Sequence, residues 1–173
     1  MTYVSLGCSC ATAFQLNKLN LRKESYPFDW CKISIRQLNL VLENDFNDFG
    51  KIDKKKWSDN HNSYIAENKY KCQFAHEIIN DLENKMEKRI DRFKRLKNPI
   101  FIRFENSRFS KNYQNELDKL IKYLNKIFYE PPKLILIIPD NYEINVKVYK
   151  IIKFHDFDPD WKYDNINWDL IHS

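Results

Sequence analysis

Glycine is nearly missing from this chain of 173 residues, which contains only 2 glycines and 6 prolines. Neither G-x-G-x-x-G, the pattern of dinucleotide-binding turns, nor G-x-x-x-x-G-K-[ST], the pattern of phosphate-binding loops, occurs in it. So few glycines and prolines also argue against a flexible low-complexity linker. The sequence therefore excludes the usual glycine-rich nucleotide-binding fingerprints.

Long apolar runs are missing as well. No segment approaches the roughly 20 apolar residues of a membrane span, and no charged start followed by an apolar core marks a secretory leader. We therefore expect a soluble, cytoplasmic protein with no membrane partner. In that compartment we expect the cysteines to be reduced thiols. They are Cys8, Cys10, Cys31 and Cys72.

A strong charge of one sign is also absent. The 29 basic residues outnumber the 24 acidic ones, but the two kinds are interspersed. Nucleic-acid binding needs basic residues gathered on one face, so we expect no nucleic-acid partner. What the chain does have is 43% hydrophobic residues, enough for a folded core. We expect residues 1–173 to form a single domain.

Apolar periodicity predicts alternating strands and helices. The expected elements are strand 2–6, helix 10–19, helix 34–42, strand 71–74, helix 78–96, strand 100–104, helix 113–128, strand 134–138 and strand 146–154. This order predicts an α/β fold, a single three-layer domain with a largely parallel central sheet flanked by helices. Residues 44–68 show no clean periodicity, and we expect them to form a long surface excursion suited to binding.

Two cysteines follow the first expected strand, in the stretch YVSLGCSCATAFQLNKL. Cys10 falls at the start of the next helix, where unpaired N–H groups and the helix dipole favour a thiolate over a thiol. The same N–H groups would bind the oxyanion formed when that thiolate attacks a carbonyl group. Residue type alone leaves another interpretation equally open, in which Cys8 and Cys10 are small buried core residues.

Histidine is the natural base for such a thiol. His76, in CQFAHE, lies between an expected strand and an expected helix, a position that aims a side chain into a cleft. His155 follows the last expected strand. For either residue, a structural histidine remains the alternative interpretation.

Several motifs occur in one order: SLGCSCATAFQL, LRKESYPFDW, FAHE, KRIDRF and PIFIRF. This series resembles the family of proteins described as papain-like cysteine peptidases of uncharacterised function. The family pattern is S-L-G-x-x-C-x-x-A-x-x-L, then S-x-P-F-D-W, then F-x-H-[DE]. The resemblance covers roughly residues 3–138. It implies that the family cysteine is Cys10 and the family histidine is His76, with Glu77 where members often have Asp.

The resemblance implies a cysteine-nucleophile hydrolase that cleaves an amide, ester or thioester, with no cofactor and no metal. Cys10 would be the nucleophile and His76 the base, while Asp29 is the candidate for orienting the histidine. Asp29 would alternatively cap a turn. Arg103 is a candidate for binding a substrate carboxylate, or else it pairs with Glu105.

Other catalytic arrangements stay open. His155 followed by Asn167 imitates the papain order of cysteine, histidine and asparagine. Asp169-Leu170-Ile171-His172 is similar to the C-terminal motif of the SGNH esterases and acyltransferases.

Two non-catalytic interpretations also remain. A zinc site can be drawn from Cys8, Cys10, Cys72 and His76, although it lacks paired C-x-x-C knuckles. A binding module on the same fold would instead use residues 44–68 to contact a partner.

Overall fold

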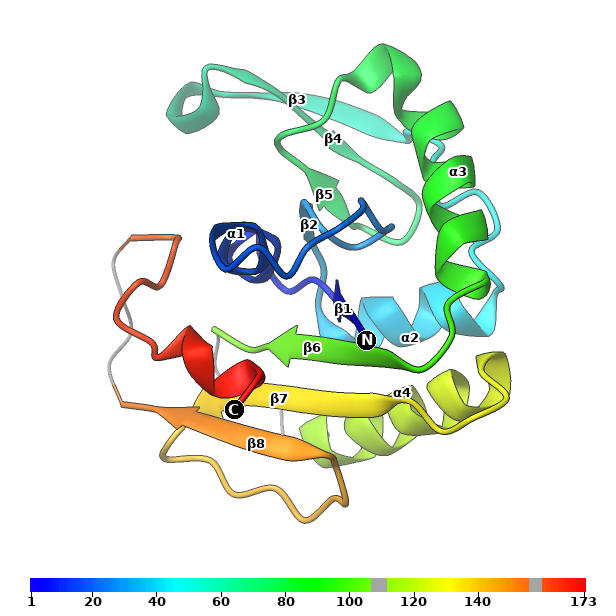
Figure 1. Cartoon of the computed structure of the whole chain (residues 1–173). Coiled ribbons are helices and arrows are strands. Elements are labelled where there is room, and N and C mark those ends of the chain that lie inside the picture. The colour runs from blue at the N-terminus through cyan, green and yellow to red at the C-terminus, as the bar shows by residue number, and fades with distance from the viewer. Residues whose placement is uncertain (107–111, 156–159) are drawn as a thin grey trace.

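Four parallel strands form the main sheet of the computed structural model, which describes residues 1–106, 112–155 and 160–173 (Figure 1). The strands are β1 (Thr2–Ser5), β6 (Pro99–Phe104), β7 (Lys133–Pro139) and β8 (Lys150–Phe154). Their order across the sheet is β1-β6-β7-β8. The predicted α/β class with a largely parallel central sheet is confirmed.

The middle strands β6 and β7 are buried on both faces, as their largely apolar sequences predict. Alternate side chains enter different cores, because successive residues of a strand point to opposite faces. Phe101 and Leu136 belong to one core, and Ile102 and Ile135 belong to the other.

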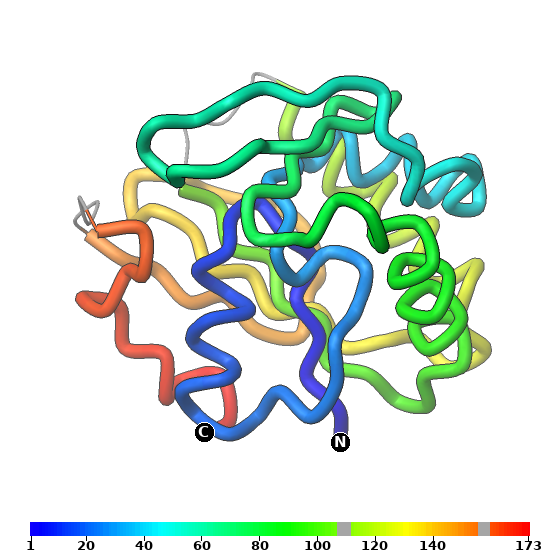
Figure 2. Tube along the Cα trace, turned by 90° about the horizontal axis from the view of Figure 1, so that it is seen from above, coloured from blue at the N-terminus to red at the C-terminus, as the bar shows by residue number. Residues whose placement is uncertain are grey.

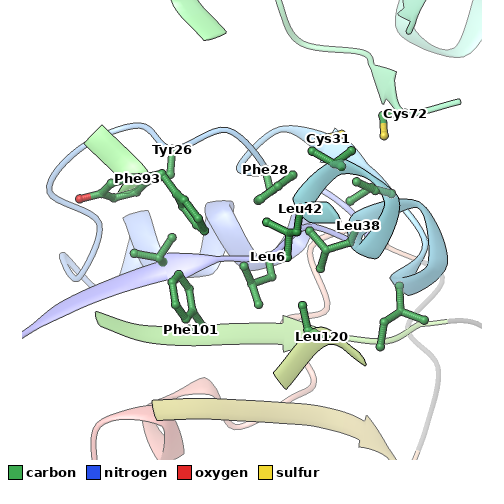
Figure 3. Close-up of a cluster of buried hydrophobic side chains, with 14 of the residues drawn as sticks. Leu6, Tyr26, Phe28, Cys31, Leu38, Leu42, Cys72, Phe93, Phe101 and Leu120 are labelled. Atoms are coloured by element: carbon green, nitrogen blue, oxygen red, sulfur yellow. The ribbon is translucent and has the colours of Figure 1, made fainter. Parts of the chain in front are cut away.

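Helices cover both faces of the main sheet. Leu38 of α2 (Ile35–Glu43), Phe93 of α3 (Leu82–Lys94) and Leu120 of α4 (Tyr113–Ile127) pack in the core that contains Phe101 (Figure 3). Helix α1 (Ala11–Lys18) packs on the opposite face through Leu16. The short turn η2 (Ile79–Asp81) leads into α3.

The C-terminal segment completes the second face, beside α1 (Figure 2). The Trp161 ring lies 5.2 Å from the Phe14 ring, and Gln15 Nε2 donates to the Lys162 carbonyl at 2.7 Å. The turn η3 (Trp168–Ile171) buries Trp168 in the same core.

A second, antiparallel sheet was not expected from the sequence. Its order is β2-β5-β4-β3, and its strands are β2 (Cys31–Lys32), β3 (Lys54–Ser58), β4 (Ser63–Glu67) and β5 (Gln73–Phe74). Strands β3 and β4 form a hairpin around η1 (Asp59–His61), within the segment predicted to be irregular. Most of the hairpin is exposed, so its sequence carries little apolar alternation. Backbone pairing of β4 with β3 and with β5, rather than burial of apolar side chains, forms these strands.

None of the helices in the described ranges is long and apolar enough to cross a membrane.

Gly7, in the turn after β1, has a φ of 77°, and a Cβ there would lie 2.4 Å from Ile33 Cγ2. We expect Gly7→Ala to lower the free energy of unfolding by about 1–3 kcal/mol or more, because the variant adds both backbone strain and a clash. Urea denaturation measures the loss. Ser9→Ala, in the same turn, should cost less than about 1 kcal/mol because it removes only the 3.3 Å bond from the Ala11 N–H to Ser9 Oγ. Equal losses in the two variants would contradict the steric explanation.

Candidate active site

The turn between β1 and α1 positions the two N-terminal cysteines differently. Gly7 and Cys8 both have positive φ values, 77° and 81°, so the chain reverses sharply before the helix. The Gly7 N–H donates to Ser5 Oγ at 3.1 Å, which holds the start of the turn. Cys10 then occupies the N-cap position of α1, and the Phe14 N–H donates to its carbonyl at 3.0 Å.

Cys10 is half-buried at the N-terminus of α1, as the sequence predicts, but its acidity differs from the prediction. Burial, followed by the negative charge of Glu77, raises the pKa of Cys10 from 9.0 to about 11. The prediction of a preformed thiolate at this helix N-terminus is therefore wrong for the free protein, because desolvation and a carboxylate outweigh the dipole. Cys10 is a neutral thiol at neutral pH.

The Cys8 side chain lies in a different environment from that of Cys10. It is buried, and its Sγ donates to Asn106 Oδ1 at 3.1 Å. Burial and Glu105 raise the pKa of Cys8 to about 12. Cys8 is thus a hydrogen-bonding thiol at the carboxyl end of β1, beside the end of β6.

His76 lies among aromatic rings from separate parts of the chain. Its ring centroid is 5.9 Å from that of Trp30, 5.6 Å from that of His61 and 6.1 Å from that of Trp161. His76 is exposed overall, and partial desolvation by these rings, followed by the neighbouring His61, lowers the pKa of His76, while Glu77 opposes that shift. The ring is therefore neutral at neutral pH, as a proton acceptor must be.

Glu77 ties the His76 segment to α3. Its buried carboxylate accepts from Arg89 Nη1 at 2.6 Å, and Lys85 Nζ lies 3.9 Å from its second oxygen. Arg92, one turn further along α3, donates from Nη1 to the Ser25 carbonyl at 2.6 Å. Two arginines of α3 thus hold the segment of His76 and the segment before Trp30.

Asp29 is bound by its own loop. It is buried and accepts from Arg22 Nε and from the Tyr26 N–H, both at 2.9 Å. Burial raises the pKa of Asp29, while Arg22 and the N–H group oppose the shift. The Arg22 guanidinium also lies 5.7 Å from the centre of the Trp30 ring, which contacts His76. These contacts link Asp29 to His76 through Arg22 and Trp30, and they fit the capping alternative.

Arg103, the candidate for binding a substrate carboxylate, is fully buried. Its Nε donates to Glu105 Oε1 at 2.6 Å, Nη1 to the Leu6 carbonyl at 2.8 Å and Nη2 to the Ile33 carbonyl at 3.0 Å. The fully buried guanidinium pairs with Glu105, as the second interpretation of Arg103 predicts, and is not exposed to bind a substrate carboxylate.

His155 follows β8, at the far side of the main sheet from β1. Its exposed ring bonds through Nδ1 to Asp140 Oδ2 at 2.5 Å. Strands β6 and β7 lie between β8 and β1, a separation of about 14 Å at the usual strand spacing. Asn167, its suggested partner, is exposed at the start of η3.

The Asp169–His172 motif lies at the other edge of the main sheet from Cys10. Lys150, the first residue of β8, donates from Nζ to the Leu170 carbonyl at 2.8 Å, so this part of the tail is near the amino end of β8. Cys10 follows the carboxyl end of β1, and the strands are parallel. The structure does not bring these residues together.

No three His, Cys, Asp or Glu side chains gather as metal ligands within residues 1–106, 112–155 and 160–173. The zinc set drawn from Cys8, Cys10, Cys72 and His76 is therefore not assembled in this structure.

Two charged residues near the candidate site, Arg22 and Arg89, are not predicted as site residues by the sequence, and Glu77 is predicted only as a substitute for the family's Asp. All three lie inside the motifs LRKESYPFDW, FAHE and KRIDRF. The signal in the sequence is the presence of charged residues within motifs rich in aromatic residues. A charge that is buried among such residues needs a partner of opposite charge.

Comparison with known proteins identifies the family. Residues 1–135 match the family described as "Putative papain-like cysteine peptidase (DUF1796)". The chain belongs to this family, as the motifs predicted. It is also 30% identical, over an alignment of 210 residues, to "Uncharacterized protein R408" of Acanthamoeba polyphaga mimivirus. That alignment covers 96% of this chain and 94% of the relative. No solved structure matches the chain significantly.

The raised pKa of Cys10 sets how alkylation depends on pH. Because only the thiolate reacts, we expect the iodoacetamide rate at Cys10 to rise about tenfold per pH unit from about pH 7 to about pH 10. Mass spectrometry of digested protein locates the label, and Cys10→Ser removes it. A rate that levels off near neutral pH would contradict the raised pKa.

Glu77→Gln should accelerate alkylation of Cys10 at a fixed mildly alkaline pH, because it removes a negative charge that opposes the thiolate. Glu83→Gln, on the exposed side of α3, is the matched control and should leave the rate unchanged. Comparable rates for Glu77→Gln and the unmodified protein would show that burial alone sets the pKa.

Arg22→Ala should lower the free energy of unfolding by about 3 kcal/mol, because it leaves the buried carboxylate of Asp29 without its cation. Burial already raises the pKa of Asp29 and Arg22 opposes that shift, so loss of Arg22 raises this pKa further and protonation then favours the folded variant. The difference in unfolding free energy between Arg22→Ala and the unmodified protein should therefore shrink as the pH falls toward about 4. Urea denaturation at several pH values measures it. Lys23→Ala is the exposed control, and a deficit independent of pH would contradict the ionic explanation.

Proposed function

We propose that this protein is a cysteine-nucleophile hydrolase in which Cys10 attacks the carbonyl carbon of an amide, ester or thioester and His76 moves the proton. The observation that supports this role is the proximity of Cys10 to the segment that carries His76. Glu77, the next residue after His76, is close enough to Cys10 to raise the pKa of its thiol. The family description points to the same chemistry.

The protonation states decide how the thiol is activated. Cys10 holds its proton at neutral pH, and the lowered pKa of His76 leaves its ring neutral and able to accept that proton. Proton transfer therefore accompanies attack, as in a serine–histidine pair, rather than preceding it in a stored ion pair.

The reaction balances with these groups alone. The Cys10 Sγ–carbon bond forms as the proton passes to His76, and the carbonyl oxygen becomes an oxyanion bound by first-turn N–H groups of α1. The leaving amine, alcohol or thiol then takes the proton from His76. Water, deprotonated by His76, cleaves the remaining thioester and restores the thiol.

The rings near His76 suggest how a substrate is held. Trp161 is exposed, Phe14 and Trp30 are half-buried, and all three lie on segments around the His76 side chain. Flat apolar surfaces of this kind bind apolar side chains of a peptide or the acyl part of an ester. The substrate class is therefore a peptide, ester or thioester with an apolar group next to the carbonyl.

An activated ester tests the proposed nucleophile without knowledge of the natural substrate. We expect p-nitrophenyl acetate to leave an acetyl group on Cys10, detected by mass spectrometry after acid quench. Cys10→Ser should abolish the adduct at that position. His76→Ala should slow acetylation by about a hundredfold or more, because it removes the general base. His155→Ala, at the far side of the sheet, should react at the unmodified rate.

Acetylation spread over surface lysines, with no effect of His76→Ala, would overturn the hydrolase proposal and favour a non-catalytic binding module on the same fold.

A further inference from the structure

A cavity of about 800 Å³ lies at the carboxyl ends of β1 and β6, apart from the rings around His76. Its lining includes Cys8, Glu105 and Asn106, which follow those two strands. This volume is within the range of small-molecule sites. The cavity therefore has the size and place of a ligand site that the proposed hydrolase chemistry does not use.

The chain connections create this crevice. The segment leaving β1 leads to α1 on one face of the main sheet, whereas the helix that follows β6, α4, lies on the opposite face. Neighbouring parallel strands whose connections diverge in this way leave an opening beyond their carboxyl ends, and ligands of open α/β sheets bind there.

Two helices begin at the cavity. Its lining contains residues 34–37, the N-cap and first turn of α2, and also Asn112, Tyr113 and Glu116 from the start of α4. Asn112, the N-cap of α4, makes no side-chain capping hydrogen bond. At the α2 end the Gln37 N–H already donates to Ser34 Oγ in a capping box. The helix dipole still places partial positive charge at both helix ends, so both favour a negative group in the cavity.

Cationic side chains at the rim act in the same direction. Lys32, Arg36, Lys71 and Lys119 all line the cavity, but Lys71 pairs with Glu67 at 3.6 Å and Lys119 pairs with Glu116 at 3.1 Å. Among the described residues, neither Lys32 nor Arg36 makes an ion pair with an acidic side chain.

The carboxylates in the lining have partners of their own. Glu116 pairs with Lys119 at 3.1 Å and accepts from Asn39 at 2.8 Å. Glu105 forms an ion pair with the buried Arg103 at 2.6 Å. The positive charge that these pairs leave in the lining is that of Lys32 and Arg36.

The floor of the cavity is polar and fixed. Glu105 accepts from Tyr113 Oη at 3.3 Å as well as from Arg103, and Asn106 accepts from the Cys8 thiol at 3.1 Å. Cys8 holds this place with a φ of 81°, a backbone conformation that costs free energy for any residue but glycine. Backbone strain of this kind clusters at active sites and ligand-binding sites.

From these observations we infer that the cavity binds a small organic oxyanion, whose phosphate or carboxylate group lies between the first turns of α2 and α4 and is neutralised by Arg36 and Lys32. The inference does not depend on the proposed hydrolase, because none of its contacts involves Cys10 or His76.

Titrations followed by amide resonances test the inference, with inorganic phosphate and citrate as probes at constant ionic strength and chloride as the reference anion. We expect saturable shifts at Cys8, Asn106 and Gln37 at millimolar or lower probe concentrations. Stronger binding of phosphate would identify a phosphate-bearing ligand, and stronger binding of citrate would identify a carboxylate.

Charge reversal at the rim provides the decisive comparison. Arg36→Glu should weaken binding by about tenfold or more, because it removes a charged hydrogen-bond donor and adds repulsion. The variant should fold, since a carboxylate in the first turn of α2 complements the helix dipole. Lys122→Glu, an exposed change of equal charge in the middle of α4, should bind as the unmodified protein does.

Two results would overturn the inference: no saturable shifts with either probe, or equal weakening by Arg36→Glu and Lys122→Glu, which would indicate unspecific attraction. Cys10→Ser should bind both probes normally whether or not the protein is a hydrolase. Loss of binding in Cys10→Ser would instead assign the anion to the Cys10 site.

Discussion

The buried guanidinium of Arg103 fixes the position of the turn that carries both N-terminal cysteines. Removing a charge from water costs several kcal/mol, so Arg103 is stable only with a full set of partners. Its partners are Glu105 and the carbonyls of Leu6 and Ile33. Leu6 directly follows β1, and Ile33 directly follows β2. One side chain therefore joins the main sheet to the second sheet, and the turn of Gly7 and Cys8 lies between the two attachments.

Charged residues of the family motifs contact one another in the folded protein. Arg22 and Asp29 pair within one motif, Arg92 binds the Ser25 carbonyl of that same motif, and Arg89 binds Glu77 beside the histidine. Segments far apart in the chain are thus held together by buried or half-buried charges. Such pairs tolerate little movement, because a separated charge would remain in a low-dielectric interior.

Two thiols separated by one residue differ because their surroundings differ. A pKa of about 11 disfavours the Cys10 thiolate by about 3 kcal/mol relative to an ordinary thiol. A helix terminus contributes only about 0.3–1 kcal/mol in the opposite direction. Burial and Glu77 therefore prevail, so Cys10 keeps its proton at neutral pH, and the proposed attack by Cys10 needs a base to accept it. Cys8, bonded to Asn106, belongs to the polar floor of a separate cavity.

The sequence by itself determined the parallel α/β core, because the runs PIFIRF and KLILIIP are apolar except for Arg103 and Lys133 and are typical of strands buried on both faces. It also determined the place of Cys10 at a helix start and the membership of the family. Tertiary structure alone decided the β3–β4 hairpin, the acidity of Cys10, and the partners of Arg103 and Glu77. The reason is that apolar periodicity is a local property of the chain, whereas pairing between polar groups and the desolvation of a thiol depend on segments that meet only in the folded protein.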